Sequence, residues 1–197
     1  MSRLKLLLAT GNSDKIKEIK EILSNLPVEI FTKNDFEDFP DVEEDGKTLE
    51  ENASKKALEI AVKYNMHTLA DDTGFFVTAL NGAPGIYAAR YAGENCSYQD
   101  NRYKMLREMK GKTDRSAYFE TATALSAPDK IIAVTHGRVN GKIATKEIGN
   151  GKFGYDPIFM VENTGKTFAE MPAQQKNKIS HRARALEKMK NTLKAYL

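Results

Sequence analysis

The chain has 197 residues, which suits one large domain or two closely packed lobes. Hydrophobic residues make up 41% and charged residues 29%, a composition typical of globular proteins and unlike that of disordered ones. No apolar run approaches the ~18 residues of a membrane span and no stretch resembles a secretion signal, so we expect a cytosolic protein with no membrane partner. A single cysteine, Cys96, excludes an intramolecular disulfide and a Cys-based zinc site, and the three histidines are scattered, so any metal would be held by carboxylates.

Charge is unevenly distributed along the chain. Residues 1–101 contain 11 basic and 18 acidic side chains, whereas residues 102–197 contain 19 and 9. A solvated surface explains such asymmetry. An acidic half that binds Mg²⁺ and a basic half that binds a polyphosphate would also produce it, and a basic surface for nucleic acid is a third interpretation.

The first third of the chain predicts a mostly parallel α/β arrangement. Apolar residues indicate a short buried strand over 4–10, and apolar residues at helical spacing indicate a helix over 15–24. A second strand is predicted over 28–33. This strand–helix–strand order is typical of α/β sheets.

An acidic loop over 34–46 follows. Thr48 then opens a long helix, and Glu51, three residues later, completes a capping box. The next strand is predicted over 67–70, ahead of a pair of aspartates.

The second half predicts longer strands. Ser97 and Asp100 are placed to cap a helix that runs to about Met109. Between 116 and 147 the pattern is that of long strands with turn signals at Ala127-Pro128-Asp129 and Asn140-Gly141, which predicts antiparallel pairing. A last helix is expected over 180–196. Together these elements predict an α/β fold with an elongated sheet between two lobes.

The first candidate site lies where the first strand turns into the first helix, at Thr10-Gly11-Asn12-Ser13-Asp14-Lys15. Glycine permits close backbone approach, a helix N-terminus presents N–H groups to an anion, and Lys15 adds a charge suited to phosphate. The spacing is not that of a Walker A loop. A Gly-Asn turn that only caps a helix is the alternative.

Two acidic segments are candidates for a metal site. Val42-Glu43-Glu44-Asp45-Gly46 crowds carboxylates that suit Mg²⁺, although a solvated acidic loop is the commoner explanation. Asp71-Asp72 follow a buried strand, at the edge where α/β sheets place ligands. In an extended chain their side chains point to opposite faces, so one acid can bind metal or water while its neighbour anchors the loop. Asp72-Thr73-Gly74 can also be only a turn.

Two further segments combine glycines, aromatic rings and cations. In Gly151-Lys152-Phe153-Gly154-Tyr155-Asp156-Pro157 two glycines bracket a ring on which a flat base can stack, or they form a structural turn. Lys176 and Ser180-His181-Arg182-Ala183-Arg184 place cations at the start of the last helix, where the helix dipole disfavours them by roughly 0.3–1 kcal/mol. An anionic or oxygen-rich ligand would offset that cost; a basic surface turn is the alternative.

Taken in this order, the segments resemble the inosine triphosphate pyrophosphatase family over nearly the whole chain. The matching motifs are Thr10-Gly11-Asn12 with Lys15, Glu43, Asn52-Ala53 with Lys56, Asp71 to Gly74, Ala83 to Tyr91, Phe153 to Pro157, and Glu170-Met171 through Lys176 to Arg182. The resemblance implies a single ITPase-like domain over 1–197, with a long mixed central sheet and helices that form two lobes around a substrate cleft. It also implies a homodimer.

The resemblance further implies a Mg²⁺-dependent enzyme that hydrolyses the deaminated purine nucleotides ITP, dITP and XTP to the monophosphate and pyrophosphate, removing them from the nucleotide pool. Thr10 to Lys15 would hold the triphosphate, with help from Lys56. Glu43, Asp71 and Asp72 would hold Mg²⁺, and Asp72 would also act as the base for the attacking water. The residues implied to contact the nucleoside are Thr73, Phe153, Gly154, Tyr155, Asp156, Lys176, His181 and Arg182.

Two alternatives stay open. A Maf-like pyrophosphatase would act on modified pyrimidine nucleotides instead. The basic C-terminal half would suit a nucleic-acid-binding module, although we expect no stable nucleic-acid partner. Pyrophosphate release without salt-sensitive binding to DNA or RNA would favour an enzyme.

Overall fold

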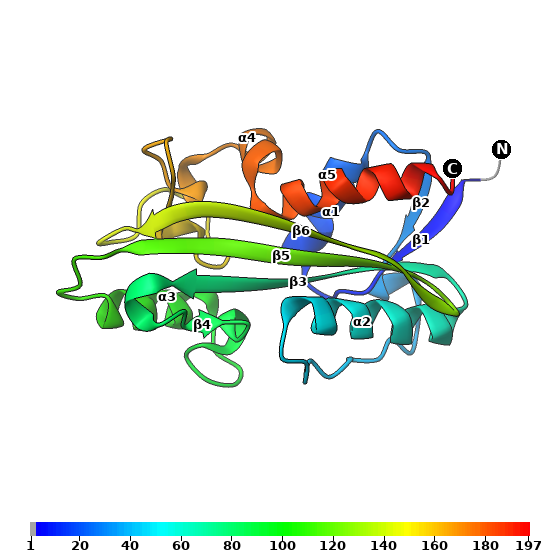
Figure 1. The fold of residues 1–197 in the computed structure, drawn as a ribbon, viewed down its shortest axis with the longest axis horizontal. Coiled ribbons are helices and arrows are strands. Elements are labelled where there is room, and N and C mark those ends of the chain that lie inside the picture. Colours follow the sequence, from blue (N-terminus) through cyan, green and yellow to red (C-terminus); the bar gives the residue numbers. More distant parts are fainter. Residues whose placement is uncertain (1–2) are drawn as a thin grey trace. The chain divides into compact units, whose positions relative to one another are not determined.

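The computed structural model describes residues 3–197 and has a mixed α/β architecture. Within these residues a seven-stranded sheet has the order β2-β1-β3-β5-β6-β7, and β4 pairs with β3 (Figure 1). The strands are β1 (Leu4–Leu8), β2 (Val28–Phe31), β3 (His67–Val77), β4 (Pro84–Gly85), β5 (Ser116–Ala127), β6 (Lys130–Ile143) and β7 (Phe159–Val161). The helices are α1 (Ser13–Leu23), α2 (Leu49–Tyr64), α3 (Tyr98–Glu108), α4 (Ala173–Ile179) and α5 (His181–Lys194). The predicted fold class, α/β with a mixed sheet, is confirmed.

The sheet is parallel at one end and antiparallel at the other. β1 pairs in parallel with both β2 and β3, so that Leu6 lies opposite Ile30 and His67. Leu6, Leu7 and Leu8 are all buried, as expected for a parallel strand that is covered on both faces. The two-residue connection between the neighbouring strands β5 and β6 makes them an antiparallel hairpin, and β7 pairs antiparallel with β6.

The chain divides into two compact units, each assembled from separate segments. Unit 1 takes the described residues of Met1–Asp72 together with Thr121–Gly137 and His181–Leu197. Unit 2 takes Thr73–Glu120 and Arg138–Ser180. Strands β3, β5 and β6 therefore contribute residues to both units.

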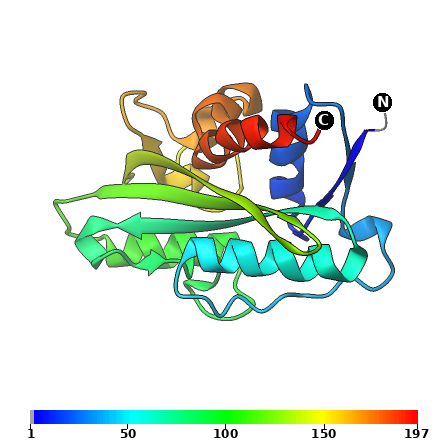
Figure 2. The ribbon, with the colours of Figure 1, turned by 45° about the vertical axis from the view of Figure 1, so that its right-hand side comes forward.

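In unit 1, α2 covers one face of the strands, while α1 and α5 cover the other (Figure 2). Leu6, Leu8, Ile19 and Leu23 form part of the buried core between the strands and α1, and Leu186 of α5 joins the same core. The start of α5 lies directly on β6, because a Cβ at Gly137 would overlap the carbonyl oxygen of His181. Glycine at 137 thus allows the helix that carries Arg182 to approach the sheet.

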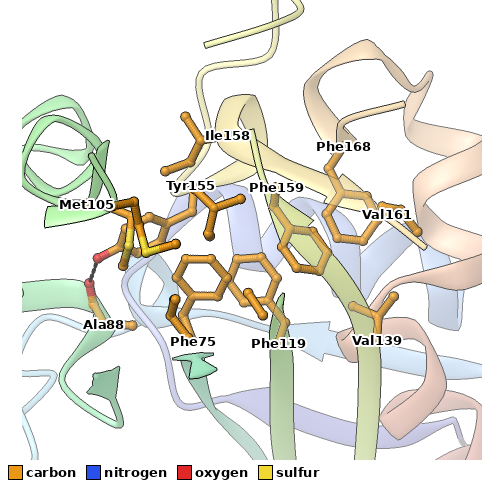
Figure 3. Packing of buried hydrophobic residues seen from close by; sticks show 14 of the residues in the cluster. Phe75, Ala88, Met105, Phe119, Val139, Tyr155, Ile158, Phe159, Val161 and Phe168 are labelled. Atoms are coloured by element: carbon orange, nitrogen blue, oxygen red, sulfur yellow. Dashed lines mark hydrogen bonds between the residues drawn. The ribbon is translucent and has the colours of Figure 1, made fainter. Parts of the chain in front are cut away.

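Unit 2 has an aromatic core. The rings of Phe75 and Phe119 stack with centroids 4.3 Å apart, and Tyr155 and Phe159 pack against the same pair (Figure 3). The hydroxyl of Tyr155 donates a hydrogen bond of 2.8 Å to the carbonyl of Ala88. Tyr155 therefore satisfies its polar atom while its ring stays buried.

Most predicted elements are confirmed, with three differences. β3 does not end before the aspartates but continues through Asp71, Asp72 and Thr73 to Val77, so the predicted end of this strand is wrong, as is the alternative that 72–74 form only a turn. β6 also runs through the predicted turn at Asn140-Gly141, because Gly141 pairs with Val161 and lies where a Cβ would overlap the Phe159 ring. The sequence predicted neither α4 nor the short strands β4 and β7. Among residues 3–197 no helix combines the length and apolar character that a membrane crossing needs.

Candidate active site

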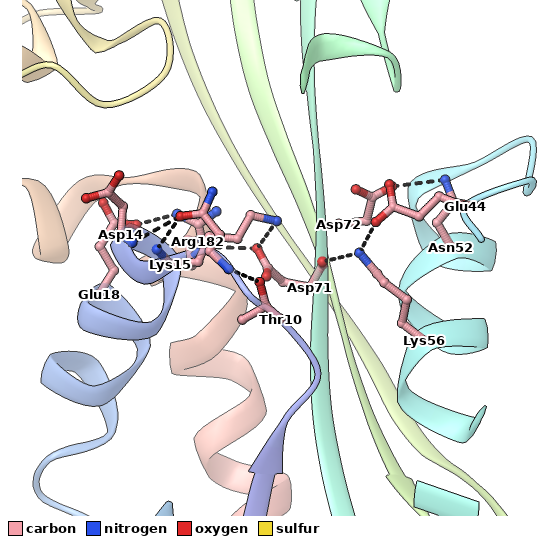
Figure 4. Close-up of polar contacts among 11 residues, drawn as sticks. Thr10, Asp14, Lys15, Glu18, Glu44, Asn52, Lys56, Asp71, Asp72 and Arg182 are labelled. Carbon is pink, nitrogen blue, oxygen red and sulfur yellow. Dashed lines mark hydrogen bonds and ion pairs between the residues drawn. The ribbon is translucent and has the colours of Figure 1, made fainter. Parts of the chain in front are cut away.

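The two consecutive aspartates of β3 face opposite sides of the strand. Figure 4 shows Asp71 turned toward α1 and α5, and Asp72 turned toward α2. This is the geometry predicted for neighbouring residues of an extended chain. Both carboxylates are buried, since Asp71 is 2% exposed and Asp72 is 5% exposed, so each needs a compensating partner.

Asp71 is surrounded by cations from two helices. Arg182 of α5 donates from Nε to Asp71 Oδ2 at 3.0 Å, and Lys15 Nζ of α1 lies 3.3 Å from the same oxygen. Burial alone would raise the pKa of Asp71, but Lys15, Arg182 and Lys56 hold it well below its usual value. Asp71 is therefore a permanent anion that fixes the position of Lys15 and Arg182.

The guanidinium of Arg182 binds a second carboxylate as well as Asp71. Its Nη1 donates to Glu18 of α1, and its side chain is only 1% exposed. The carboxylates of Glu18 and Asp71 offset the dipole cost expected for a cation at the start of α5. The nucleoside contact implied for Arg182 stays a prediction, since in the structure the guanidinium binds two carboxylates of unit 1.

Asp72 faces a different environment on α2. Asn52 Nδ2 donates to Asp72 Oδ2 at 3.1 Å. Burial raises the pKa of Asp72, and although Lys56 opposes that shift, Glu44 adds to it. A buried carboxylate with a raised pKa is a better proton acceptor than an ordinary aspartate.

Lys56 connects the backbone of Asp71 to Glu44 of the acidic loop. Its ammonium donates to the backbone carbonyl of Asp71 at 2.8 Å and to Glu44 Oε1 at 2.5 Å. Burial alone would lower the pKa of Lys56, but Asp72, Glu44 and Asp71 raise it, so this lysine stays charged.

The segment Thr10 to Lys15 forms the N-terminus of α1. Asn12 is the N-cap, and its Oδ1 accepts from the backbone N–H groups of Asp14 (3.0 Å) and Lys15 (3.2 Å). Gly11, Ser13 and Asp14 are exposed around this cap. Burial and the neighbouring cations lower the pKa of Lys15, while Asp71 opposes that shift. The Asn12 cap and the Lys15 ammonium thus both lie at the N-terminus of α1.

The structure brings Glu44, rather than Glu43, to the aspartates. Glu43 is exposed, whereas Glu44 reaches Lys56 and acts on Asp72 through its charge. Gly46 N–H donates to Asn52 Oδ1 at 2.8 Å, which anchors the acidic loop on α2 beside Asp72. Sequence reasoning missed Glu44 as a site residue, because two adjacent acids on a loop carry the same signal.

Asp72 and Glu44 supply hard oxygen atoms, a donor type that suits a divalent cation. Among residues 3–197 no group of three or more His, Cys, Asp or Glu side chains is arranged to hold a metal ion. Mg²⁺ is usually bound through one or two carboxylates together with substrate phosphates and water. Asp72 and Glu44, brought near each other by Lys56 and Asn52, supply such a pair of hard oxygen ligands.

A second cluster of predicted residues lies in unit 2. Lys176 Nζ pairs with Asp156 Oδ2 at 2.5 Å, and both side chains are less than a tenth exposed. The same ammonium lies 4.7 Å from the centre of the Phe153 ring and 5.5 Å from that of Phe168. Phe153 is half-buried, so one flat, partly accessible ring lies beside a buried cation.

The remaining predicted residues are placed as follows. Gly154 is part of the turn that carries Phe153, and Tyr155 belongs to the aromatic core. Thr73 is half-buried and follows Asp72 on β3. His181 is buried and is the first residue of α5.

Comparisons with known proteins give one consistent result. Residues 6–192 match the model of the Ham1 family. The chain is 45% identical over 190 residues to a dITP/XTP pyrophosphatase of Thermoanaerobacter sp. (strain X514), covering 95% of this chain and 96% of that protein. It is 46% identical over 191 residues to a dITP/XTP pyrophosphatase of Geobacter sulfurreducens, covering 96% of each.

A solved structure agrees with these sequence matches. The Ham1 protein of Staphylococcus aureus superposes with a TM-score of 0.86 at 40% identity, covering 98% of this chain and 100% of that one. The resemblance inferred from the motifs is thereby confirmed. Because the family match and both relatives span almost all of its length, the chain belongs to the Ham1 family.

Proposed function

We propose that the protein hydrolyses the deaminated purine nucleotides dITP, XTP and ITP to the monophosphate and pyrophosphate, and so removes them from the nucleotide pool. The relatives named dITP/XTP pyrophosphatase support this substrate class. The observation that carries the proposal is that Asp71 and Asp72 lie in different electrostatic environments, which shift their pKa values in opposite directions. One carboxylate is neutralised by buried cations, while its neighbour has a raised pKa beside a second carboxylate. The pyrimidine and nucleic-acid alternatives have no comparable support.

The triphosphate is assigned to the N-terminus of α1 and to two lysines. The positive end of the helix dipole favours an anion there, although Asn12 Oδ1 already accepts from the N–H groups of Asp14 and Lys15. Lys15, held by Asp71, and Lys56, held by Glu44 and the Asp71 carbonyl, supply fixed positive charge. Since phosphoryl transfer depends mainly on positioning and charge neutralisation, these groups need no covalent nucleophile.

Asp72 is assigned as the general base. It accepts a proton from the attacking water, and a P–O–P bond breaks as the water oxygen bonds to phosphorus. Asn52 keeps the carboxylate oriented through its 3.1 Å hydrogen bond. Bound to Asp72 and Glu44, Mg²⁺ would neutralise charge on the phosphates. Asp71, with its lowered pKa, remains the anion that positions Lys15.

The nucleobase of the substrate is assigned to the turn in unit 2. Phe153 offers a face for stacking, and Lys176 is a donor for a 6-oxo group. A site that donates to a 6-oxo group rejects adenine, whose 6-amino group brings a donor instead. From the family resemblance alone we also propose a homodimer, and since its substrates are free nucleotides we place the enzyme in the cytosol.

A panel of nucleoside triphosphates tests the proposal. Pyrophosphate release should be Mg²⁺-dependent, and kcat/KM should be far higher for ITP, dITP and XTP than for ATP, GTP or CTP. Equal kcat/KM for ATP and ITP would contradict the substrate class. Binding to DNA or RNA that weakens steeply with salt, without turnover, would favour the nucleic-acid alternative.

A further inference from the structure

Arg102 is a buried arginine outside the residues assigned so far. It lies on α3, and only 5% of the residue is exposed. Its Nε donates to Glu147 Oε1 at 2.8 Å, and its Nη1 donates to the carbonyl of Gly154 at 2.9 Å and, more weakly, to that of Lys152 at 3.4 Å. All three partners belong to one loop of unit 2, the loop that carries Phe153.

This loop, residues 147–157, is closed at its base and tightly turned at its tip. The Ile148 N–H donates to the Pro157 carbonyl at 2.8 Å, and the Asp156 N–H donates to the Phe153 carbonyl at 3.0 Å. Gly154 has a φ of 47°, a left-handed conformation that glycine adopts without strain. Arg102 joins the first residue of the loop, Glu147, to the two carbonyls that flank Phe153 at the tip.

Helix α3 is a firm base for this contact. Met105 and Met109 at its C-terminal end are fully buried in the core of unit 2. Asn101, beside Arg102, donates to the Ala89 carbonyl at 2.9 Å and accepts from the Ala92 N–H at 2.7 Å. Tyr98, one helical turn before Arg102, meets the Phe153 ring edge-on with centroids 5.5 Å apart. One face of α3 therefore touches both the backbone and the ring of the tip.

The chemistry of the contact favours arginine over lysine. A guanidinium presents several donors in a fixed planar fork, whereas an ammonium is a single point of charge. Here the fork serves a carboxylate with one nitrogen and the tip carbonyls with another. Losing it would leave the carbonyls of Lys152 and Gly154 and the carboxylate of Glu147 without their charged donor, so the tip would lose its fixed conformation.

We propose that Arg102 is a positioning residue: it holds the 152–154 tip in the conformation in which Phe153 meets the base. The inference rests on the proposed function, which places the nucleobase of the substrate at Phe153. The hydrogen bonds described for Arg102 all go to the loop that carries Phe153, so it governs KM for the nucleotide and leaves kcat nearly unchanged. It acts through Phe153, so removal of the ring should remove its effect.

The test compares Arg102→Met and Arg102→Lys with a matched control, Arg107→Met. Arg107 is an exposed arginine of the same helix. With XTP, Arg102→Met should raise KM about tenfold with little change in kcat, as expected for loss of one or two hydrogen bonds. Arg102→Lys keeps the pair with Glu147, so its KM should lie between those of the wild type and Arg102→Met. Arg107→Met should have the KM of the wild type.

Two further measurements separate positioning from a general structural role. Hydrogen exchange of the 151–155 amides should accelerate in Arg102→Met, while exchange in α3 stays at the wild-type rate. In a double-mutant cycle with Phe153→Leu, the KM effect of Arg102→Met should largely disappear, because the two residues act as one unit.

Unchanged exchange at the tip, or additive KM effects in the cycle, would overturn the proposal. So would a loss confined to kcat. If Arg102→Met does not fold, Arg102→Lys is judged by the same criteria. Absence of turnover by the wild-type protein would refute the proposed function, whereas the exchange comparison decides independently whether Arg102 holds the tip.

Discussion

Asp72→Asn should abolish most of the activity while making the protein more stable. The substitution keeps the shape of the side chain but removes the proton acceptor and one metal ligand. Loss of a general base lowers kcat by ~10²–10⁴, which is about 2.7–5.4 kcal/mol on the activation barrier. The amide can still accept from Asn52 Nδ2, now 3.1 Å from Asp72 Oδ2, so the local hydrogen bond survives.

The stability gain follows from the direction of the pKa shift. Burial raises the pKa of Asp72 in the folded protein, so the folded state binds its proton more tightly than the unfolded chain does. The ionised carboxylate therefore destabilises the fold at every pH above its folded pKa, and this penalty vanishes below the unfolded value of about 3.9. At pH 7.5 we expect Asp72→Asn to gain within the ~0.5–2 kcal/mol typical of stabilising substitutions.

Asp71→Asn is the matched control, because it makes the same change one residue earlier with the opposite expected sign. The folded pKa of Asp71 is lowered, so its ionised form contributes stability above about pH 3.9 that is lost as the pH falls toward the folded pKa. Removing this charge leaves Lys15 without its ion pair and Arg182 with Glu18 alone, and should cost ~3–5 kcal/mol at pH 7.5.

Urea denaturation at pH 7.5 and pH 4, together with pyrophosphate release at saturating Mg²⁺, measures both effects. The gain from Asp72→Asn should be smaller at pH 4, whereas the loss from Asp71→Asn should largely persist there, because Asp71 stays ionised down to its lowered folded pKa. Near-normal turnover by Asp72→Asn would refute its role as base. Equal destabilisation by the two substitutions would refute the division of roles between the aspartates.

Three further predictions concern residues around this centre. Glu44→Gln should raise the Mg²⁺ concentration needed for half-maximal activity, whereas Glu43→Gln should not; a Mg²⁺ titration that shifts equally for both would contradict the choice of Glu44. Lys15→Met should raise KM for the triphosphate in steady-state kinetics, because it removes a fixed charge at the α1 N-terminus; an unchanged KM would remove Lys15 from the site. Tyr155→Phe should lower the free energy of unfolding by ~1 kcal/mol without changing KM, because the hydroxyl donates to the Ala88 carbonyl rather than to a ligand. A raised KM would show that the hydroxyl contacts the nucleotide.

Local patterns predicted much of the fold. The apolar run of β1 and the periodicity of α1 were sufficient for a parallel opening, and Ser97 with Asp100 does form a capping box at the start of α3. Thr48 also caps α2, although Glu51 accepts from the Lys47 N–H instead of completing the box. These signals act within a few residues of chain, which is why the sequence alone contains them.

The features that the sequence did not predict depend on distant partners. Asp71-Asp72-Thr73-Gly74 has the composition of a turn, yet it continues β3, whose neighbours in the sheet, β1 and β5, come from distant parts of the chain. The choice between Glu43 and Glu44 depends on how the loop docks on Asn52, which no spacing rule describes. The opposite orientation of the two aspartates was predictable, because it follows from strand geometry alone.

The order of segments in unit 1 has a consequence for synthesis of the protein. Chains generally fold from the N-terminus as they leave the ribosome, but unit 1 contains both the first described residues and His181–Leu197. While the polypeptide is being made, Asp71 already exists and its partner Arg182 does not. A nascent chain that has not yet reached α5 would have to bury this carboxylate without its arginine, so unit 1 completes its fold only after α5 has been synthesised. A chain truncated shortly before residue 181 should therefore leave the core of unit 1 without its last helix, and we expect it to be degraded rather than partly active.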